Sequence, residues 1–182
     1  MDQAVETAMK LFHARGYDAV GVAELGAAFG ITPPSFYAAF GSKAGLFARV
    51  LERYTDSKAN LFTYARAKGG SVATVIAHMF LRAAELYPAC DGVAGCLVLD
   101  GARNSADPDA RALTAAAKQG ARAALRDFIA TEYPQRAEAL AGFVTIALAG
   151  MSAAARDGAD RASLDAFAAS MSRAFRREAR QV

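Results

Sequence analysis

The segment from 22 to 43 constrains the fold of this chain most, because two short helical patterns stand on either side of a tight turn. Its sequence is VAELGAAFGITPPSFYAAFGSK. The first eight residues repeat apolar side chains at the spacing of one helical face, and Gly30 follows, where a residue without Cβ ends a helix at little cost. Thr32 then caps a second helix, and Pro33 takes its first position, where no backbone N–H is required. Helix, glycine turn and capped helix form the layout of a DNA-reading helix-turn-helix.

The segment from about 5 to 54 resembles the DNA-binding domain of the tetracycline-repressor (TetR) family of bacterial transcription regulators. The pieces that carry the resemblance are LFHARGY (11–17), VAELGAAFGI (22–31), PPSFYAAF (33–40) and SKAGLF (42–47). No one of these pieces is specific by itself, but together they are. The rest of the chain shows no motif of a known family.

An all-α fold is predicted for the whole chain, with about nine helices. Residues 1–54 form a three-helix DNA-binding domain, and residues 55–182 form a larger helical domain to which the resemblance gives ligand binding and dimerisation. A helix that begins after Ser42 is expected to continue to about Lys68, where a Gly-Gly-Ser linker ends it. Beyond the linker apolar residues follow helical spacing, and no run alternates as a strand would.

Composition adds limits on function. The 182 residues carry a net charge of +3, but residues 1–54 hold five basic and five acidic side chains, so overall charge is no evidence for DNA binding. Charges occur throughout the first 20 residues, so no secretory signal is expected and the location is predicted to be cytoplasmic. The charge-free stretch 139–155 favours a buried helix over a membrane span, because it is short and contains polar residues.

The N-terminal residues of a recognition helix meet base edges in the major groove. Here the predicted DNA-binding residues are Thr32, Pro33, Pro34, Ser35, Tyr37 and Ala38, followed by Lys43. They include no Arg, Asn or Gln for bidentate base pairing, so specificity is expected to rest on apolar contacts and DNA shape. The alternative is an ordinary helical hairpin.

Lys43 is the strongest single clue, because a cation in the first turn of a helix opposes the helix dipole. Backbone N–H groups and the ammonium together suit a phosphate. The resemblance places a phosphate-binding lysine at this position and a phosphate-contacting tyrosine at Tyr37; a solvated surface lysine is the alternative. The chain departs from the family pattern at Gly21, Ala39 and the absent basic extension before the first helix, so weaker DNA affinity is expected.

The resemblance implies a homodimer built from the last two long helices. The predicted dimer contacts are Ala141, Leu148, Met151, Phe167, Met171 and Phe175. The alternative is that these stripes fill the core of one protomer. The resemblance also implies a small-molecule inducer between the middle helices. The candidate ligand-binding residues are Phe62, His78, Met79, Phe80, Leu99, Arg103 and Phe143. Any of them could instead be an ordinary core residue.

Two cysteines, Cys90 and Cys96, leave one alternative from another class, a thiol-based redox sensor or enzyme. No cluster has the spacing of a metal site, and no cofactor or nucleotide-binding motif or nucleophile elbow is present, so neither an enzyme nor a cofactor is expected. A third alternative is a helical binding module that never contacts DNA. The favoured prediction is a ligand-responsive repressor of transcription.

Overall fold

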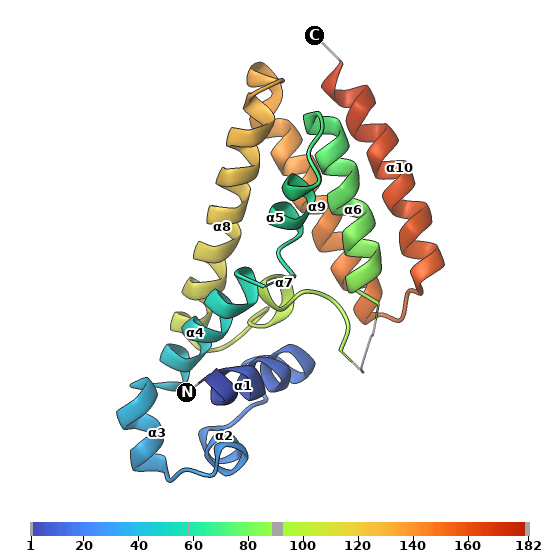
Figure 1. The fold of residues 1–182 in the computed structure, drawn as a ribbon. Helices are drawn as coiled ribbons and strands as arrows, with labels where there is room; N and C mark the ends of the chain where they lie inside the picture. Colours follow the sequence, from blue (N-terminus) through green and yellow to red (C-terminus); the bar gives the residue numbers. More distant parts are fainter. Residues whose placement is uncertain (1, 58, 89–92, 181–182) are drawn as a thin grey trace. The chain divides into compact units, whose positions relative to one another are not determined.

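The computed structural model describes residues 2–57, 59–88 and 93–180, and all regular elements in these ranges are helices (Figure 1). They are α1 (Asp2–Arg15), α2 (Val22–Phe29), α3 (Pro33–Phe40), α4 (Lys43–Thr55), α5 (Leu61–Ala67), α6 (Val72–Leu86), α7 (Leu97–Asp100), α8 (Pro108–Ala130), the short 3-10 helix η1 (Pro134–Arg136), α9 (Ala137–Arg156) and α10 (Arg161–Ala179). The all-α prediction is confirmed.

The chain divides into two compact units, each made of two segments. The first unit contains Met1–Ser57 and Cys96–Lys118, and the second contains Lys58–Gly95 and Gln119–Val182. α8 begins in the first unit and ends in the second. Residues 96–118, which the sequence analysis assigned to the C-terminal domain, therefore pack with the N-terminal segment.

Local capping explains where the helices of the first unit begin and end. Gly30 closes α2 in the left-handed conformation, with φ of 68°. The Thr32 hydroxyl accepts the backbone N–H of Ser35, and the Ser42 hydroxyl accepts that of Gly45 at 2.9 Å. α2 begins after Gly21 without a side-chain cap. The turn and both caps lie where the sequence predicted them.

The predicted single helix from Ser42 to about Lys68 was wrong. α4 ends at Thr55, and α5 begins at Leu61. A second cap explains the break, because the Asn60 side chain accepts the backbone N–H of Thr63 at 3.0 Å and starts a new helix.

An aromatic cluster fixes α1 against α4 in the first unit. The ring of Phe12 lies 5.7 Å from that of Tyr17 and 5.2 Å from that of Phe47, measured between centroids, and all three residues are buried. The first pair is stacked and the second is edge-on, and ring pairs in such arrangements stabilise a core beyond the area that they bury.

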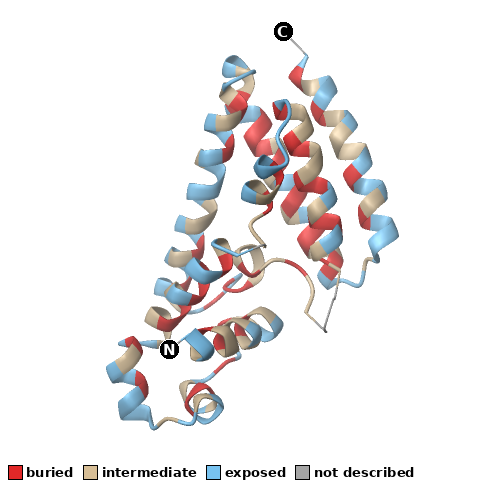
Figure 2. Ribbon diagram, in the orientation of Figure 1, coloured by how far each residue is buried: buried red, intermediate tan, exposed pale blue. Residues whose placement is uncertain are grey.

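In the second unit α6 packs against α5, α9 and α10 (Figure 1). Figure 2 shows the buried residues of α10 along one side of that helix, as expected for a helix that covers a core. The segment Pro134–Arg156 is long and apolar enough to cross a membrane by composition alone. It nevertheless buries Leu140, Val144 and Met151 between neighbouring helices, which is the packing of a core helix.

Candidate nucleic-acid interface

The predicted recognition helix is α3, and it has one buried and one exposed face. Phe36 and Phe40 are buried, with ring centroids 5.1 Å apart, whereas the intervening Tyr37 is 51% exposed. All predicted contact positions on α3 and its cap are exposed: Thr32, Pro33, Pro34, Ser35, Tyr37 and Ala38. The hydroxyls of Thr32 and Ser35 lie 3.0 Å apart and share a hydrogen bond. An exposed helical face of this kind fits the major groove of B-DNA, which is about 12 Å wide.

The Lys43 ammonium is bonded within the protein, unlike the solvated side chain that was the alternative in the sequence analysis. Its Nζ donates hydrogen bonds to the backbone carbonyls of Tyr17 and Val20, each at 3.1 Å, and lies 4.0 Å from the centroid of the Tyr17 ring. The ammonium has three hydrogens, so these two bonds leave one for another acceptor. Lys43 thus ties the turn between α1 and α2 to the start of α4.

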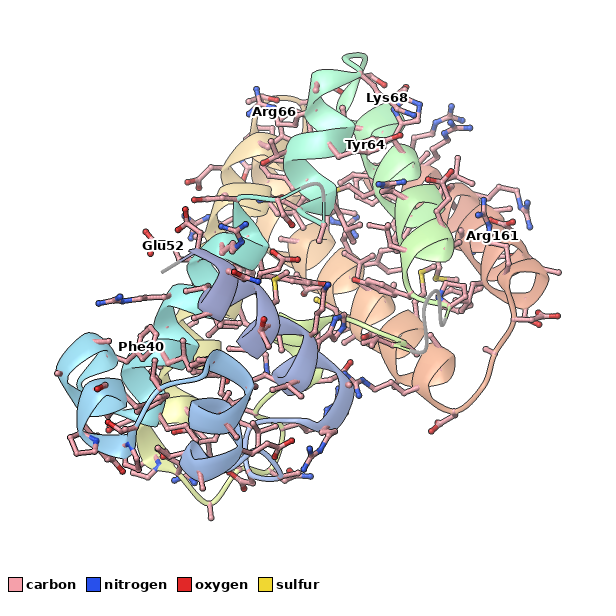
Figure 3. The ribbon with its side chains drawn as sticks, turned by 60° about the horizontal axis from the view of Figure 1, so that its bottom comes forward. Phe40, Glu52, Tyr64, Arg66, Lys68 and Arg161 are labelled. Atoms are coloured by element: carbon pink, nitrogen blue, oxygen red, sulfur yellow. The ribbon has the colours of Figure 1, made fainter. Side chains whose placement is uncertain are left out.

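Arg49 is a cation beside the recognition helix that the sequence reasoning missed. Its guanidinium carbon lies 5.5 Å from the centroid of the Phe40 ring, and the residue is exposed. Phe40 is labelled on the reading head, α1 to α4, in Figure 3. Two other arginines of the reading head are neutralised, because Arg15 pairs with Glu24 and Arg53 pairs with Glu6. A second cation six positions after Lys43, on the same helix α4, could have drawn attention to Arg49.

A polar network that the sequence reasoning also missed joins the turn between α1 and α2 to the corner between α7 and α8. The Tyr17 hydroxyl donates to Asp107 Oδ2 at 2.8 Å, and the Ser105 hydroxyl donates to Asp18 Oδ1 at 2.5 Å. The backbone N–H of Ala106 donates to Asp18 Oδ2 at 2.9 Å. These bonds cross about ninety positions of sequence, and only the Asp-Pro start of α8 marked one end of the network.

The network shifts the acidity of its members. The hydrogen bond from Ser105 lowers the pKa of the Asp18 carboxyl, and the one from Tyr17 lowers the pKa of the Asp107 carboxyl. Burial and the Asp107 carboxylate raise the pKa of the Tyr17 hydroxyl. At neutral pH two carboxylates therefore accept hydrogen bonds from neutral donors, an arrangement stronger than a neutral pair.

The predicted ligand-binding residues fall into both units. Phe62, His78, Met79, Phe80 and Phe143 belong to the second unit, and Leu99 and Arg103 belong to the first. Met79 and Phe80 are buried in the core, while Arg103 is exposed and pairs with Asp100 at 3.0 Å. The Nδ1 atom of His78 is buried and has no hydrogen-bond partner in the described part of the chain. Among the described candidates, His78 alone has a buried side-chain polar atom without a hydrogen bond.

Phe62 and Phe143 are already in aromatic contacts. The Phe62 ring meets the Phe128 ring at 5.5 Å, and the guanidinium of Arg66 lies over both rings. Phe143 lies 6.4 Å from the ring of the buried Phe175. Figure 3 shows Arg66 on one side of α5 and Tyr64 and Lys68 on the other. The apolar surfaces that these candidates would give to a ligand are partly occupied by their neighbours.

The Cys96 thiol lacks the lowered pKa of a reactive cysteine. Burial raises the pKa of its thiol, and hydrogen bonds from the Leu99 backbone and the Tyr54 hydroxyl only partly oppose this effect. A reactive cysteine needs the opposite shift. Cys90, the other candidate of the redox hypothesis, lies outside the described residues. Within the described ranges no group of three or more His, Cys, Asp or Glu side chains is placed to bind a metal ion.

Four of the six predicted dimer contacts lie in the core of the protomer. Ala141, Leu148, Met151 and Phe175 are buried, whereas Phe167 is 39% exposed and Met171 is half-buried. The neighbouring Gly142 admits another part of the same chain, because a Cβ there would lie 3.3 Å from the Arg122 guanidinium. The close approach at Gly142 is therefore intramolecular.

The chain is similar to known regulatory proteins in sequence and in fold. The family model described as bacterial regulatory proteins, tetR family, matches residues 4–50, which contain most of α1, all of α2 and α3, and the first part of α4. Over 168 residues the chain is 41% identical to the HTH-type transcriptional repressor BdcR of Escherichia coli (strain K12), covering 92% of this chain and 85% of that protein. The chain belongs to the tetR family of bacterial regulatory proteins.

Two more comparisons extend the TetR match over the full fold. The HTH-type transcriptional repressor ComR of Escherichia coli (strain K12) is 32% identical over 173 residues, covering 87% of this chain and 80% of that protein. A cysteine mutant of the TetR family transcriptional regulator CifR, complexed with 26-bp double-strand operator DNA, superposes with a TM-score of 0.82 at 30% identity and covers 95% of both chains. This TetR chain is a DNA-binding transcriptional regulator and not an enzyme.

Proposed function

We propose that this TetR chain is a cytoplasmic repressor that binds operator DNA as a homodimer and leaves it when a small molecule binds. The observation that carries the proposal is the exposed face of α3, with Tyr37 51% exposed between two buried phenylalanines. The relatives BdcR and ComR are named repressors, and the CifR structure contains operator DNA, which supports the same activity here.

Few side chains of α3 and its cap can contact the DNA bases. Thr32 and Ser35 offer hydroxyls, and the prolines and Ala38 offer only apolar contacts, such as those to thymine methyl groups. None of these side chains makes a bidentate base pair, so sequence-dependent DNA shape and two summed half-sites supply much of the specificity. In this proposal the Tyr37 hydroxyl and the remaining hydrogen of Lys43 donate to phosphates, and such contacts fix the register of the helix on the duplex.

A second copy of the chain supplies the recognition helix for the second DNA half-site. Ile146 on α9 is 73% exposed and Phe167 on α10 is 39% exposed, and the two helices pack against each other. These exposed apolar side chains, together with Met171, are the part of the α9–α10 surface that a partner would cover. In such a dimer the recognition helices stand one DNA turn apart, about 34–36 Å.

The proposed inducer site lies beside α6. His78 offers a buried Nδ1 without a partner among the described residues, next to Met79 and Phe80. Buried polar atoms are normally satisfied, so a polar atom of a ligand at this position would gain a hydrogen bond that the free protein lacks. An apolar ligand with one such atom fits these side chains best.

The test is fluorescence anisotropy with a labelled duplex from upstream of the chain's own gene and with a scrambled duplex, over a salt series. We expect preferential binding of two chains to the upstream duplex and a steep salt dependence. Tyr37→Ala should weaken this binding about 10- to 100-fold, from roughly 1–3 kcal/mol of lost contact.

Leu81→Ala is the matched control, because Leu81 is a large apolar side chain on α6 that is 43% exposed. It should bind like the wild-type protein. Equal affinity of the wild-type protein for both duplexes, or equal loss in the two variants, would contradict the assignment of α3 as the DNA reader.

A further inference from the structure

Four side chains of the first unit form what we call the clasp: Tyr17, Asp18, Ser105 and Asp107. They connect the turn between α1 and α2 to the corner between α7 and α8 through the bonds from Tyr17 to Asp107, from Ser105 to Asp18 and from the Ala106 backbone to Asp18. A backbone bond from the Tyr17 N–H to the Gly101 carbonyl, at 2.7 Å, runs beside them. The reading head is thus bonded to a segment about ninety positions away in sequence.

Asp107 also organises the start of α8. Its Oδ1 accepts the backbone N–H groups of Asp109 and Ala110, at 2.9 and 3.1 Å, while its Oδ2 accepts the Tyr17 hydroxyl. The two oxygens of one carboxylate therefore join the first turn of α8 to the reading head. α8 continues without interruption to Ala130, and its second half belongs to the other unit.

Tyr17 is bonded on its other side to the start of α4. Its carbonyl accepts a hydrogen bond from Lys43 Nζ, and the same ammonium lies over its ring. Lys43 begins α4 directly after the turn that ends the recognition helix α3. One residue therefore carries a continuous path of hydrogen bonds from the cap of α8 to the lysine beside the DNA-reading surface.

The path has two discrete arrangements, one with the bond from Tyr17 to Asp107 formed and one with it broken. Tyr17 is 1% exposed, so if its hydroxyl loses Asp107 it has no solvent to replace the bond unless the turn moves. A displaced first turn of α8 would take Asp107 with it, because the cap bonds fix the carboxylate to that turn. The turn between α1 and α2 then either follows or releases.

We propose that Tyr17 and Asp107 are positioning residues for operator binding: their hydrogen bond keeps α3 and Lys43 in the arrangement that operator DNA requires. Displacement of the first turn of α8 breaks this bond and lowers operator affinity. The inference rests on the proposed function, since it concerns how the same reading head is regulated.

The variants for the test are Tyr17→Phe, Asp107→Ser and the double substitution. Tyr17→Phe removes the hydroxyl and keeps the ring that packs on Phe12 and Phe47. Asp107→Ser keeps an N-cap oxygen for α8 but cannot also reach Tyr17. Tyr133→Phe is the control, because the Tyr133 hydroxyl makes no hydrogen bond within the ranges that the structure describes. Affinity is measured for a duplex that the wild-type protein selects from a random pool, and for an unselected duplex.

Tyr17→Phe and Asp107→Ser should each raise the dissociation constant for the selected duplex roughly 5- to 20-fold, in the lower part of the usual range of coupling between sites. The double substitution should do no more than either alone, because both remove one bond. Binding to the unselected duplex should not change. Equal losses on both duplexes, additive losses, or behaviour identical to Tyr133→Phe would overturn the proposal.

A second measurement uses the wild-type protein only and therefore does not depend on how the variants fold. If the clasp and operator binding favour one another, operator binding must tighten the clasp in return. Hydrogen exchange at the amides of Asp109 and Ala110, which bond to Asp107, should slow when the selected duplex binds. Unchanged exchange there would overturn the proposal, whereas failure to select any duplex would contradict the proposed function itself.

Discussion

Replacing Gly45 with alanine tests the contact that joins the recognition helix to α4. Gly45 lies in the first turn of α4, and a Cβ on it would stand 2.2 Å from the backbone carbonyl oxygen of Phe40, the last residue of α3. The obstacle is backbone, which cannot rotate away as a side chain would. A single methyl group therefore forces α3 and α4 apart.

Two opposing effects decide the size of the change. Alanine is preferred over glycine inside a helix by at most about 1 kcal/mol. Against this, the Cβ must retreat by at least 0.8 Å to reach 3.0 Å, the shortest separation that real Cβ atoms show. Overpacking of this kind costs about 1–3 kcal/mol. The cost of the clash exceeds the gain in helix propensity, and we expect the free energy of unfolding to fall by roughly 1–2 kcal/mol.

Thermal and urea unfolding measure this loss of stability. Fluorescence anisotropy with a labelled operator duplex measures the effect on DNA affinity. The melting temperature of Gly45→Ala should fall by about 2–8 °C for a chain of this size. Operator affinity should fall as well, because the displaced end of α3 carries the exposed contact face. Gly120→Ala is the matched control: Gly120 lies within α8 with nothing within 4 Å of an added Cβ, so this variant should gain about 0.5–1 kcal/mol.

A Gly45→Ala protein as stable as the Gly120→Ala protein, with unchanged operator affinity, would refute this reasoning. It would mean that α3 and α4 do not approach one another as closely as the 2.2 Å contact requires.

Three further predictions follow from burial and acidity. Because the pKa of Asp18 is lowered on folding, its contribution to stability is present at neutral pH and is lost as the pH falls from the usual aspartate value through the lower folded value. Asp18→Asn should therefore reduce the fall of the urea midpoint below about pH 4 and leave its pH dependence near pH 7 unchanged. Phe175→Ala should cost about 3–5 kcal/mol because the ring is fully buried, whereas Phe167→Ala should leave protomer stability unchanged and raise the dimer dissociation constant in sedimentation experiments. In a Cys90→Ser background, the Cys96 thiol should react slowly with a disulfide reagent at pH 7 until urea exposes it, and immediate reaction in the native protein would revive the thiol-sensor hypothesis.

The reading head could be predicted from the sequence because its signals are local. Gly30, Thr32 and Ser42 each act on backbone groups within a few residues, so their chemistry alone sets the ends of α2, α3 and α4. The break between α4 and α5 was local too, and the cap at Asn60 could have revealed it. It was missed because the apolar stripe seemed continuous across the break.

The clasp and the packing around α9 could not be predicted, since they depend on partners distant in sequence. No pattern near Tyr17 indicates that its hydroxyl meets Asp107. Small residues such as Ala141 and Gly142 indicate that something approaches closely, but they do not say whether it is a second protomer or the chain's own Arg122. Periodicity identifies a buried face, and only the fold names what buries it.

The division of α8 between the two units bears on how regulators of this kind can be recombined. A chimera that joins only residues 1–54 to a foreign ligand-binding body separates Tyr17 and Asp18 from Asp107 and Ser105. A graft that also carries 96–118 transfers both sides of those bonds, with its last junction inside α8. The transplantable module is therefore discontinuous, and interchange of reading heads among such proteins should succeed when the donor supplies both segments.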